Sequence, residues 1–325
     1  MPRLFVLASM FISALSFFAS TAQAQSWPTR PVKFVVPYGP AIGIDIMARM
    51  IADRLSRRLG QPVIVDNQPG ANSTIGTQNV ARAEPDGYTL LFTGNSPLTS
   101  NIYLLKSLPY DPRKAFDAVA MIADRGPFTL SVNPNLPITT LAELIDYAKT
   151  RPGQLNYAFD SSSAYNWVVG QYLNRRAGIE LVAVPYRTTS QAFQDTLAGV
   201  TQLAVGSVAA SAPFTQSGKL RRLAITSKGR FPGSEELPTF EETLPGFRLE
   251  GFLPLMAPAG LPVEIAQRLN MELAQVLEDK EVLQRMASFG YATSGAETPD
   301  EVNHRLAADR DMWSTFAKDL NIQPQ

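Results

Sequence analysis

Apolar and polar positions alternate most clearly in residues 31–60. The apolar run at residues 32–36 is typical of a short buried strand, and the prolines and glycine after it predict a tight loop. From Ile44 onward apolar residues recur at steps of three or four, which predicts a helix. Gly60 follows at the position where many helices end in a left-handed residue. This stretch therefore predicts a strand, a loop and a helix.

The predicted loop precedes the N-terminus of the predicted helix. Backbone N–H groups are unpaired there and the helix dipole is positive, so an anion or a carboxylate can bind. The same pattern also fits an ordinary strand–helix unit that binds nothing. The residues of this stretch leave both interpretations open.

The rest of the chain alternates between short apolar runs and helical patterns. Capping boxes at Thr140 and Thr298 predict two helix starts, and a helix of about 15 residues is expected after Pro262. Strands are expected near residues 63–65, 88–92, 128–132, 155–158, 179–185, 203–205, 221–226 and 251–257. This order predicts an α/β fold of two lobes joined by two crossing strands, with lobe 1 formed by residues 25–127 plus 251–325 and lobe 2 by residues 128–250. A cleft between such lobes can open and close.

Small polar residues follow several predicted strands. In open α/β sheets, ligands bind in loops at strand ends, but the hydroxyls at residues 93–96 and 161–163 also fit helix N-caps. Arg187 comes where a strand meets a loop, and its guanidinium suits a carboxylate ligand. A structural ion pair with a nearby aspartate is the alternative for Arg187.

The first 24 residues have the features of an export signal. Arg3 supplies a positive start, an apolar segment follows, and residues 22–24 read Ala-Gln-Ala, a small-x-small cleavage site. We therefore expect cleavage near Ala24 and export of the chain. The remaining length of roughly 300 residues favours two lobes over one core.

The composition argues against several functions. The chain has no cysteine and a single histidine, His304, and it lacks a G-x-S-x-G elbow, so we expect no catalytic residue, no metal and no cofactor. The formal net charge is +0, with 29 basic and 29 acidic residues, which argues against nucleic acid as a partner.

Nine short motifs recur in an order that resembles a known family. They are Pro37-Tyr38, Gln61-Pro62-Val63, Asn67-Gln68-Pro69-Gly70, Pro85-Asp86-Gly87-Tyr88-Thr89-Leu90, Leu108-Pro109-Tyr110-Asp111-Pro112, Pro152-Gly153-Gln154-Leu155-Asn156-Tyr157, Val184-Pro185-Tyr186-Arg187, Gly218-Lys219-Leu220-Arg221 and Ala257-Pro258-Ala259-Gly260. Together they resemble the Bug/TctC family, the periplasmic solute-binding receptors of tripartite tricarboxylate transporters. The resemblance implies a type II periplasmic-binding fold that closes on a small carboxylate and delivers it to membrane permease subunits.

The resemblance also implies a set of ligand-binding residues in the cleft. They are Tyr38, Gly39, Ala41, Ile42, Gly43 and Asp45 after the first strand, Thr93 and Asn95 after the third, and Phe159, Ser161, Ser162, Ser163, Asn166, Arg187, Gly206 and Ser207 in the second lobe. In the family, backbone amides and bridging waters hold the carboxylate.

This chain departs from the family pattern within those loops. Ala41 and Ile42 replace a usual glycine pair; glycine allows positive φ, whereas alanine and isoleucine are not expected to adopt it. Trp167 replaces a frequent histidine. Gly206 stands where an acidic residue is common. The aromatic residues of the loops suggest an aromatic or longer-chain acid, although Phe159 and Trp167 fit a core position equally well. An alternative function is a periplasmic sensor that signals to a membrane histidine kinase.

Overall fold

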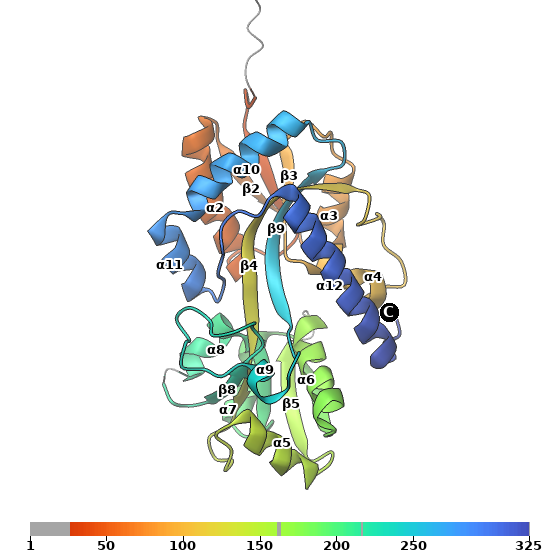
Figure 1. Cartoon of the computed structure of the whole chain (residues 1–325), viewed down its shortest axis with the longest axis vertical. Coiled ribbons are helices and arrows are strands. Elements are labelled where there is room, and N and C mark those ends of the chain that lie inside the picture. Colours follow the sequence, from red (N-terminus) through yellow and green to blue (C-terminus); the bar gives the residue numbers. More distant parts are fainter. Residues whose placement is uncertain (1–26, 161–163, 216, 325) are drawn as a thin grey trace, which may run out of the picture.

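One sheet of nine strands runs through both halves of the molecule (Figure 1). The computed structural model describes residues 27–160, 164–215 and 217–324, so the expected signal segment and its cleavage site lie outside the described residues. The strand order is β2-β1-β3-β9-β4-β7-β5-β6, and β8 pairs with β4. The predicted two-lobed α/β fold with two crossing strands is confirmed.

The upper half of Figure 1 holds the parallel strands that begin the chain. The strands are β1 (Val32–Val36), β2 (Val63–Asn67) and β3 (Thr89–Phe92). The helices α2 (Gly43–Leu59), α10 (Val263–Leu277) and α11 (Lys280–Ser288) cover one face of these strands, and α3 (Thr74–Ala81) and α12 (Pro299–Asp319) cover the other. A 3-10 turn at Ser96–Leu98 and the short helix α4 (Asn101–Leu104) follow β3.

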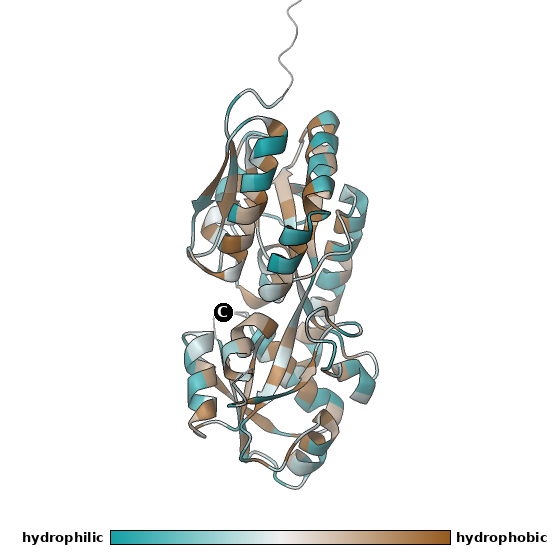
Figure 2. Cartoon of the chain, turned by 90° about the vertical axis from the view of Figure 1, so that its left-hand side faces the viewer, coloured by the Kyte–Doolittle hydropathy of each residue, from teal (hydrophilic) through white to brown (hydrophobic). Residues whose placement is uncertain are grey.

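The lower half repeats this layered arrangement. Its strands are β5 (Leu155–Asp160), β6 (Leu181–Tyr186), β7 (Leu203–Ser207) and β8 (Arg221–Ile225). The helices α5 (Leu141–Lys149), α6 (Ala164–Ala177) and α9 (Phe240–Thr243) pack on one face, and α7 (Thr189–Leu197) and α8 (Val208–Thr215) pack on the other. Figure 2 shows the helices hydrophilic on their outer sides and hydrophobic toward the strands.

Two antiparallel strands join the halves. They are β4 (Phe116–Val132) and β9 (Glu250–Pro258). In the upper half they pair with each other, from Phe116 opposite Pro258 to Pro127 opposite Glu250, and in the lower half β4 pairs with β7 and β8. The sequence predicted β4 only from Phe128 onward. Its first twelve residues were missed because they are buried on both faces and therefore do not alternate between apolar and polar.

The helix boundaries follow from local chemistry that the sequence displays. Both predicted capping boxes are formed: the Thr140 hydroxyl accepts from Glu143 N, and the Thr298 hydroxyl accepts from Glu301 N. Gly60 ends α2 with φ of 68°, a left-handed conformation that glycine adopts without steric cost. His304 is exposed on α12.

Helix α12 contacts both halves. Its first turns bury Val302 and Leu306 in the upper core, while its last turns bury Trp313 and Phe316 in the lower core. Trp313 is fully buried against Phe316, with ring centroids 5.8 Å apart. The helix therefore connects the halves along a third path, besides the two strands.

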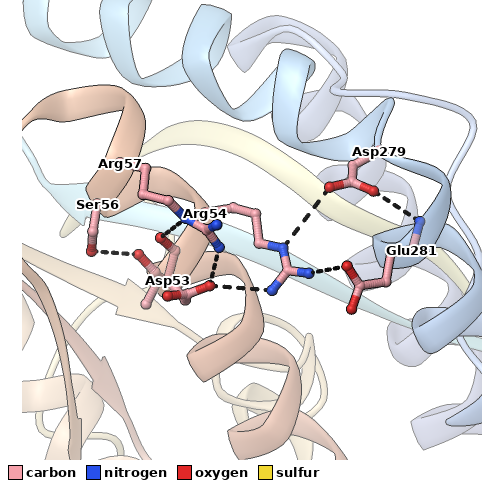
Figure 3. Close-up of polar contacts among 7 residues, drawn as sticks. Asp53, Arg54, Ser56, Arg57, Asp279 and Glu281 are labelled. Carbon is pink, nitrogen blue, oxygen red and sulfur yellow. Dashed lines mark hydrogen bonds and ion pairs between the residues drawn. The ribbon is translucent and has the colours of Figure 1, made fainter.

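An ion-pair network fixes α11 against α2 (Figure 3). Arg54 on α2 pairs with Glu281 at 2.7 Å and approaches Asp279, the N-cap of α11, at 3.9 Å.

We expect Arg54→Ala to lower the free energy of unfolding by about 1 kcal/mol at low salt, and by less at high salt because exposed charges are screened. Urea unfolding at two salt concentrations measures this. Arg57→Ala is the matched control, because among the residues that the structure describes Arg57 pairs only with Asp53 of its own helix. Equal losses in both variants would contradict the prediction.

Candidate functional site

A cavity of about 970 Å³ lies between the two halves. Its volume is at the upper end of the range for small-molecule sites. The lining residues come from the loops after β1, β2 and β3, from the start of α2, from the crossing strands, from the ends of β5 and β7, from α4 and α6, from the loop after α11 and from the C-terminus. The polar lining residues include Tyr38, Asn72, Ser73, Asn95, Ser96, Asn101 and Ser207, and the apolar ones include Ile42, Leu104, Phe128, Phe159, Trp167, Phe252, Leu320 and Ile322.

Within the described part of the chain, no Lys, Arg, Asp or Glu side chain lines this cavity. Its titratable lining groups are phenols, and burial raises the pKa of Tyr38, Tyr165 and Tyr291 above the usual tyrosine value. These tyrosines are therefore neutral at physiological pH and offer O–H groups. Such a lining can bind a solute by hydrogen bonds and apolar contact, but not by an ion pair.

The loop after β1 contributes only part of the predicted set. Tyr38, Gly39 and Ile42 line the cavity, whereas Ala41, Gly43 and Asp45 do not. The Tyr38 hydroxyl lies 3.5 Å from that of Thr93, which is fully buried and does not reach the cavity either.

Asp45 is a structural anion at the start of α2. Its carboxylate accepts from Ala41 N at 2.8 Å and from Asn67 Nδ2 at 2.9 Å, and it pairs with Arg49 at 3.0 Å. Burial would raise its pKa, but the hydrogen bonds from Arg49, Ala41 and Asn67 outweigh it and lower the pKa. Because Asp45 supplies the negative charge at this helix end, a ligand carboxylate has less to gain there than the sequence suggested.

Ala41 has a positive φ, although alanine was not expected to adopt this conformation in place of glycine. Its φ is 64°, in the left-handed region, which costs a residue with a Cβ roughly 1 kcal/mol. The expectation that alanine excludes positive φ is therefore wrong at this position. The hydrogen bond from Ala41 N to Asp45 holds the strained turn.

Relief of this strain is measurable. We expect Ala41→Gly to raise the free energy of unfolding by up to about 1 kcal/mol, since glycine adopts positive φ freely and its greater unfolded-state entropy offsets part of the gain. Chemical denaturation provides the measurement. Ala308→Gly, at an exposed interior position of α12, should lower stability by about 1 kcal/mol. A loss of stability in Ala41→Gly as well would contradict the prediction.

The loop after β2 was not among the predicted site residues. Four consecutive residues there have positive φ: Gly70 at 126°, Ala71 at 46°, Asn72 at 53° and Ser73 at 69°. Gly70, Asn72 and Ser73 line the cavity, and Asn101 Nδ2 donates to Asn72 O at 2.9 Å. Non-glycine residues in this conformation cluster at functional sites. The turn-forming composition of residues 66–74 was visible in the sequence, but nothing in it showed which way the loop faces.

The loop after β3 enters a buried hydrogen-bond network. Asn95 lines the cavity, and its amide donates to the Tyr165 hydroxyl of α6 and, at 3.2 Å, to Asp309 of α12. Tyr165 in turn donates to Asp309 at 2.9 Å and accepts from Trp313 Nε1 at 2.8 Å. Burial is the main reason that the pKa of Asp309 rises to about 6. The network joins an upper loop, a lower helix and α12 beside the cavity.

Only some of the predicted site residues of the second lobe line the cavity. Phe159 and Ser207 line the cavity, whereas Asn166, Arg187 and Gly206 do not; Arg187 is exposed at the end of β6. Ser161, Ser162 and Ser163 lie outside the described residues. Trp167 lines the cavity and also packs against the lower core, so both interpretations of this residue hold.

Gly206 has a packing role that explains its presence. A Cβ at this position would lie 2.7 Å from Phe193 Cε2, and Phe193 is fully buried. Any larger residue would have to displace this ring. The acidic residue that is common in the family at this position is therefore incompatible with the packing of this lobe.

Comparison with known proteins decides the family. The family described as the tripartite tricarboxylate transporter family receptor, TctC, matches residues 47–319. The chain belongs to the TctC family. A UPF0065 protein of Bordetella bronchiseptica is 34% identical over 324 residues, covering 100% of this chain and 95% of the relative. Protein BugT of Bordetella pertussis is 33% identical over 325 residues, covering 99% of both chains.

Solved structures of TctC and Bug proteins share the fold. An R. palustris protein with adipate has a TM-score of 0.80 and 32% identity, covering 92% of this chain and all of that one (100%). MatC from Rhodopseudomonas palustris, with bound malate, has a TM-score of 0.72 and 27% identity, covering 89% of this chain and 99% of the other. Proteins of the TctC family are periplasmic receptors that bind substrates and are not enzymes.

The described residues contain neither a helix suited to span a membrane nor a group of side chains suited to hold a metal ion. Within residues 27–160, 164–215 and 217–324, no helix is both long and apolar enough to cross a membrane. In the same part of this TctC chain, no three His, Cys, Asp or Glu side chains come together as they would around a metal ion.

Proposed function

We propose that this protein is a periplasmic receptor that captures a small organic acid in the cavity between its lobes and delivers it to a tripartite tricarboxylate-type transporter. The single observation that carries the proposal is the cavity itself, which lies between two layered halves and is lined by neutral hydrogen-bonding groups and aromatic rings. Adipate and malate in two related structures support a carboxylate as the ligand.

Recognition of the carboxylate would depend on neutral donors. The hydroxyls of Tyr38, Ser73 and Ser207 are the side-chain groups that we assign to it, with backbone N–H groups of the Gly39 loop. A buried charge needs several such hydrogen bonds to replace its hydration. Each additional carboxylate adds to this cost, so a cavity without a cationic side chain favours an acid with one carboxylate and an apolar or aromatic body.

Closure of the cleft would use the predicted lobes. We assign residues 25–127 plus 251–325 to lobe 1 and residues 128–250 to lobe 2, because β4 and β9 cross between the halves near Pro127 and Glu250. Rotation about these crossings would bring Phe159 and Ser207 toward Tyr38 and Gly39.

Thermal unfolding with a panel of organic acids tests the proposal. A ligand present at about 100 times its Kd should add about 2.7 kcal/mol of apparent stability. The panel should contain adipate, malate, straight-chain monocarboxylates and aromatic acids. If no member shifts the unfolding curve at millimolar concentration, the proposed function is wrong.

The membrane partner and the export signal belong to the same proposal. We expect cleavage near Ala24 and association with permease subunits. Mass spectrometry of the protein from the periplasm gives the new N-terminus, and a pull-down from membranes of the native host identifies the partner. Recovery of a histidine kinase instead of a permease would favour the sensor function.

A further inference from the structure

The C-terminal segment, residues 320–323, lines the cavity between the lobes. This segment follows α12, and in both Figure 1 and Figure 2 the C-terminus lies at the level between the upper and lower halves. The loops expected from the sequence to bind the ligand all follow strands. The C-terminal segment instead follows a helix, α12.

A reversal at the end of α12 directs this segment to the cavity. Asn321 has φ of 49°, its N–H donates to Lys318 O at 3.2 Å, and Ile322 N donates to Ala317 O at 2.9 Å. These two bonds form a Schellman motif, with asparagine as the left-handed residue. The turn thus has defined hydrogen bonds, and Gln323 Nε2 adds a further one to Asn321 O at 3.3 Å.

The wall that results is apolar. Leu320 and Ile322 are partly buried against the lower core, as are Leu104 of α4 and Trp167 of α6, and all four line the cavity. The polar groups Tyr38 and Ser73 belong to loops of the upper half. The lower core, Leu104 of α4 and the C-terminal segment therefore give the cavity an apolar wall, and Tyr38 and Ser73 of the upper loops give it hydroxyl groups.

We propose that Leu320 and Ile322 of the C-terminal segment form an apolar wall of the ligand site and select acids whose hydrocarbon portion is long enough to reach them. The inference rests on the proposed function and names the substrate class of the same site. The carboxylate would bind the upper loops, and each methylene placed against the wall would add affinity by leaving water. The affinity of acids too short to reach the wall would not depend on it.

Calorimetric titration with acetate, butyrate, hexanoate, octanoate and adipate tests this. In the wild type, affinity should rise with chain length. Ile322→Ala should weaken octanoate by about fivefold and leave butyrate unchanged, because only the longer chain loses contact. Shortening the chain by residues 324–325 is the control for a change at the C-terminus, because it leaves the cavity-lining residues 320–323 in place, and it should keep wild-type affinities.

The outcomes separate this inference from the function on which it rests. If affinity rises equally with chain length in the wild type and in Ile322→Ala, the proposed role of the segment is wrong and the receptor function stands. The same conclusion follows if the affinity of the wild type does not rise with chain length. Binding of no acid by the wild type would overturn both. Ile322 is only partly buried, so the variant is expected to fold, and its thermal unfolding curve verifies that before titration.

Discussion

Asp309→Asn is expected to gain stability over the wild type as the pH rises. The free energy of unfolding of the variant minus that of the wild type should be about 3 kcal/mol larger at pH 8 than at pH 4. Burial raises the pKa of Asp309 from 3.8 to about 6. A carboxyl group whose pKa is raised by folding contributes stability below its unfolded pKa and loses that contribution as the pH rises through its folded pKa. The wild type should therefore lose this stability between about pH 4 and pH 6.5, and the neutral asparagine should not.

Asparagine suits the site because its carbonyl oxygen can replace Asp309 Oδ2. That oxygen accepts from Tyr165 at 2.9 Å and from Asn95 at 3.2 Å. Urea unfolding from pH 4 to pH 8 measures the difference between the two proteins at each pH. Asp311→Asn, at an exposed position of the same helix, is the control and should change far less with pH. A difference between wild type and Asp309→Asn that stays constant over this range would contradict the prediction.

Gly170→Ala is expected to lower the free energy of unfolding by about 3 kcal/mol. An added Cβ would lie 2.3 Å and 2.4 Å from Tyr157 Cζ and Cε2, far inside van der Waals contact. The ring cannot move aside easily, since Tyr157 is fully buried and its hydroxyl donates to Trp167 O at 3.0 Å and accepts from Gln171 at 2.8 Å. The only relief is a shift of α6 away from β5.

Such a shift would also affect the cavity. Helix α6 carries Tyr165 and Trp167, both of which line it, so ligand affinity should fall together with stability. Gly43→Ala is the matched control: its Cβ would meet nothing closer than 3.8 Å, and the residue begins a helix. Chemical denaturation of both variants measures the effect. A loss below about 1 kcal/mol in Gly170→Ala would show that the helix–strand contact is looser than these distances imply.

The order of strands and helices was predictable because local signals produce it. Capping boxes at Thr140 and Thr298 and the left-handed Gly60 act within a few residues of each helix end, so the sequence displays them. The crossing strand β4 was predicted only in its lower part. The residues before Phe128 are buried on both faces, and a strand of this kind lacks the alternation on which sequence analysis depends.

The site was less predictable because its geometry depends on contacts between distant segments. Asp45 was assigned to a ligand, but Asn67 and Arg49 engage its carboxylate in the structure. Gly206 was assigned to the cleft, but the approach of Phe193 explains it. The network of Asn95, Tyr165 and Asp309 joins residues up to 214 positions apart, and no periodicity or motif reports such a contact.

The C-terminal wall illustrates the same limit. Asn321 just after the last helical residues is a recognisable signal for a left-handed turn, but the destination of the chain after that turn depends on the lower core against which Leu320 and Ile322 pack. The aromatic residues of the loops suggested an aromatic or longer-chain acid, and the uncharged lining is compatible with such a ligand.

Calorimetric titration of the wild-type protein with an organic acid, after removal of any co-purified solute by unfolding and refolding, tests the central claim most directly. We expect one acid to bind per protein chain, with affinity lost in Asn95→Ala because this residue lines the cavity and links both lobes. Absence of binding heat and of any change in the unfolding curve, across mono- and dicarboxylates at millimolar concentration, would contradict the account.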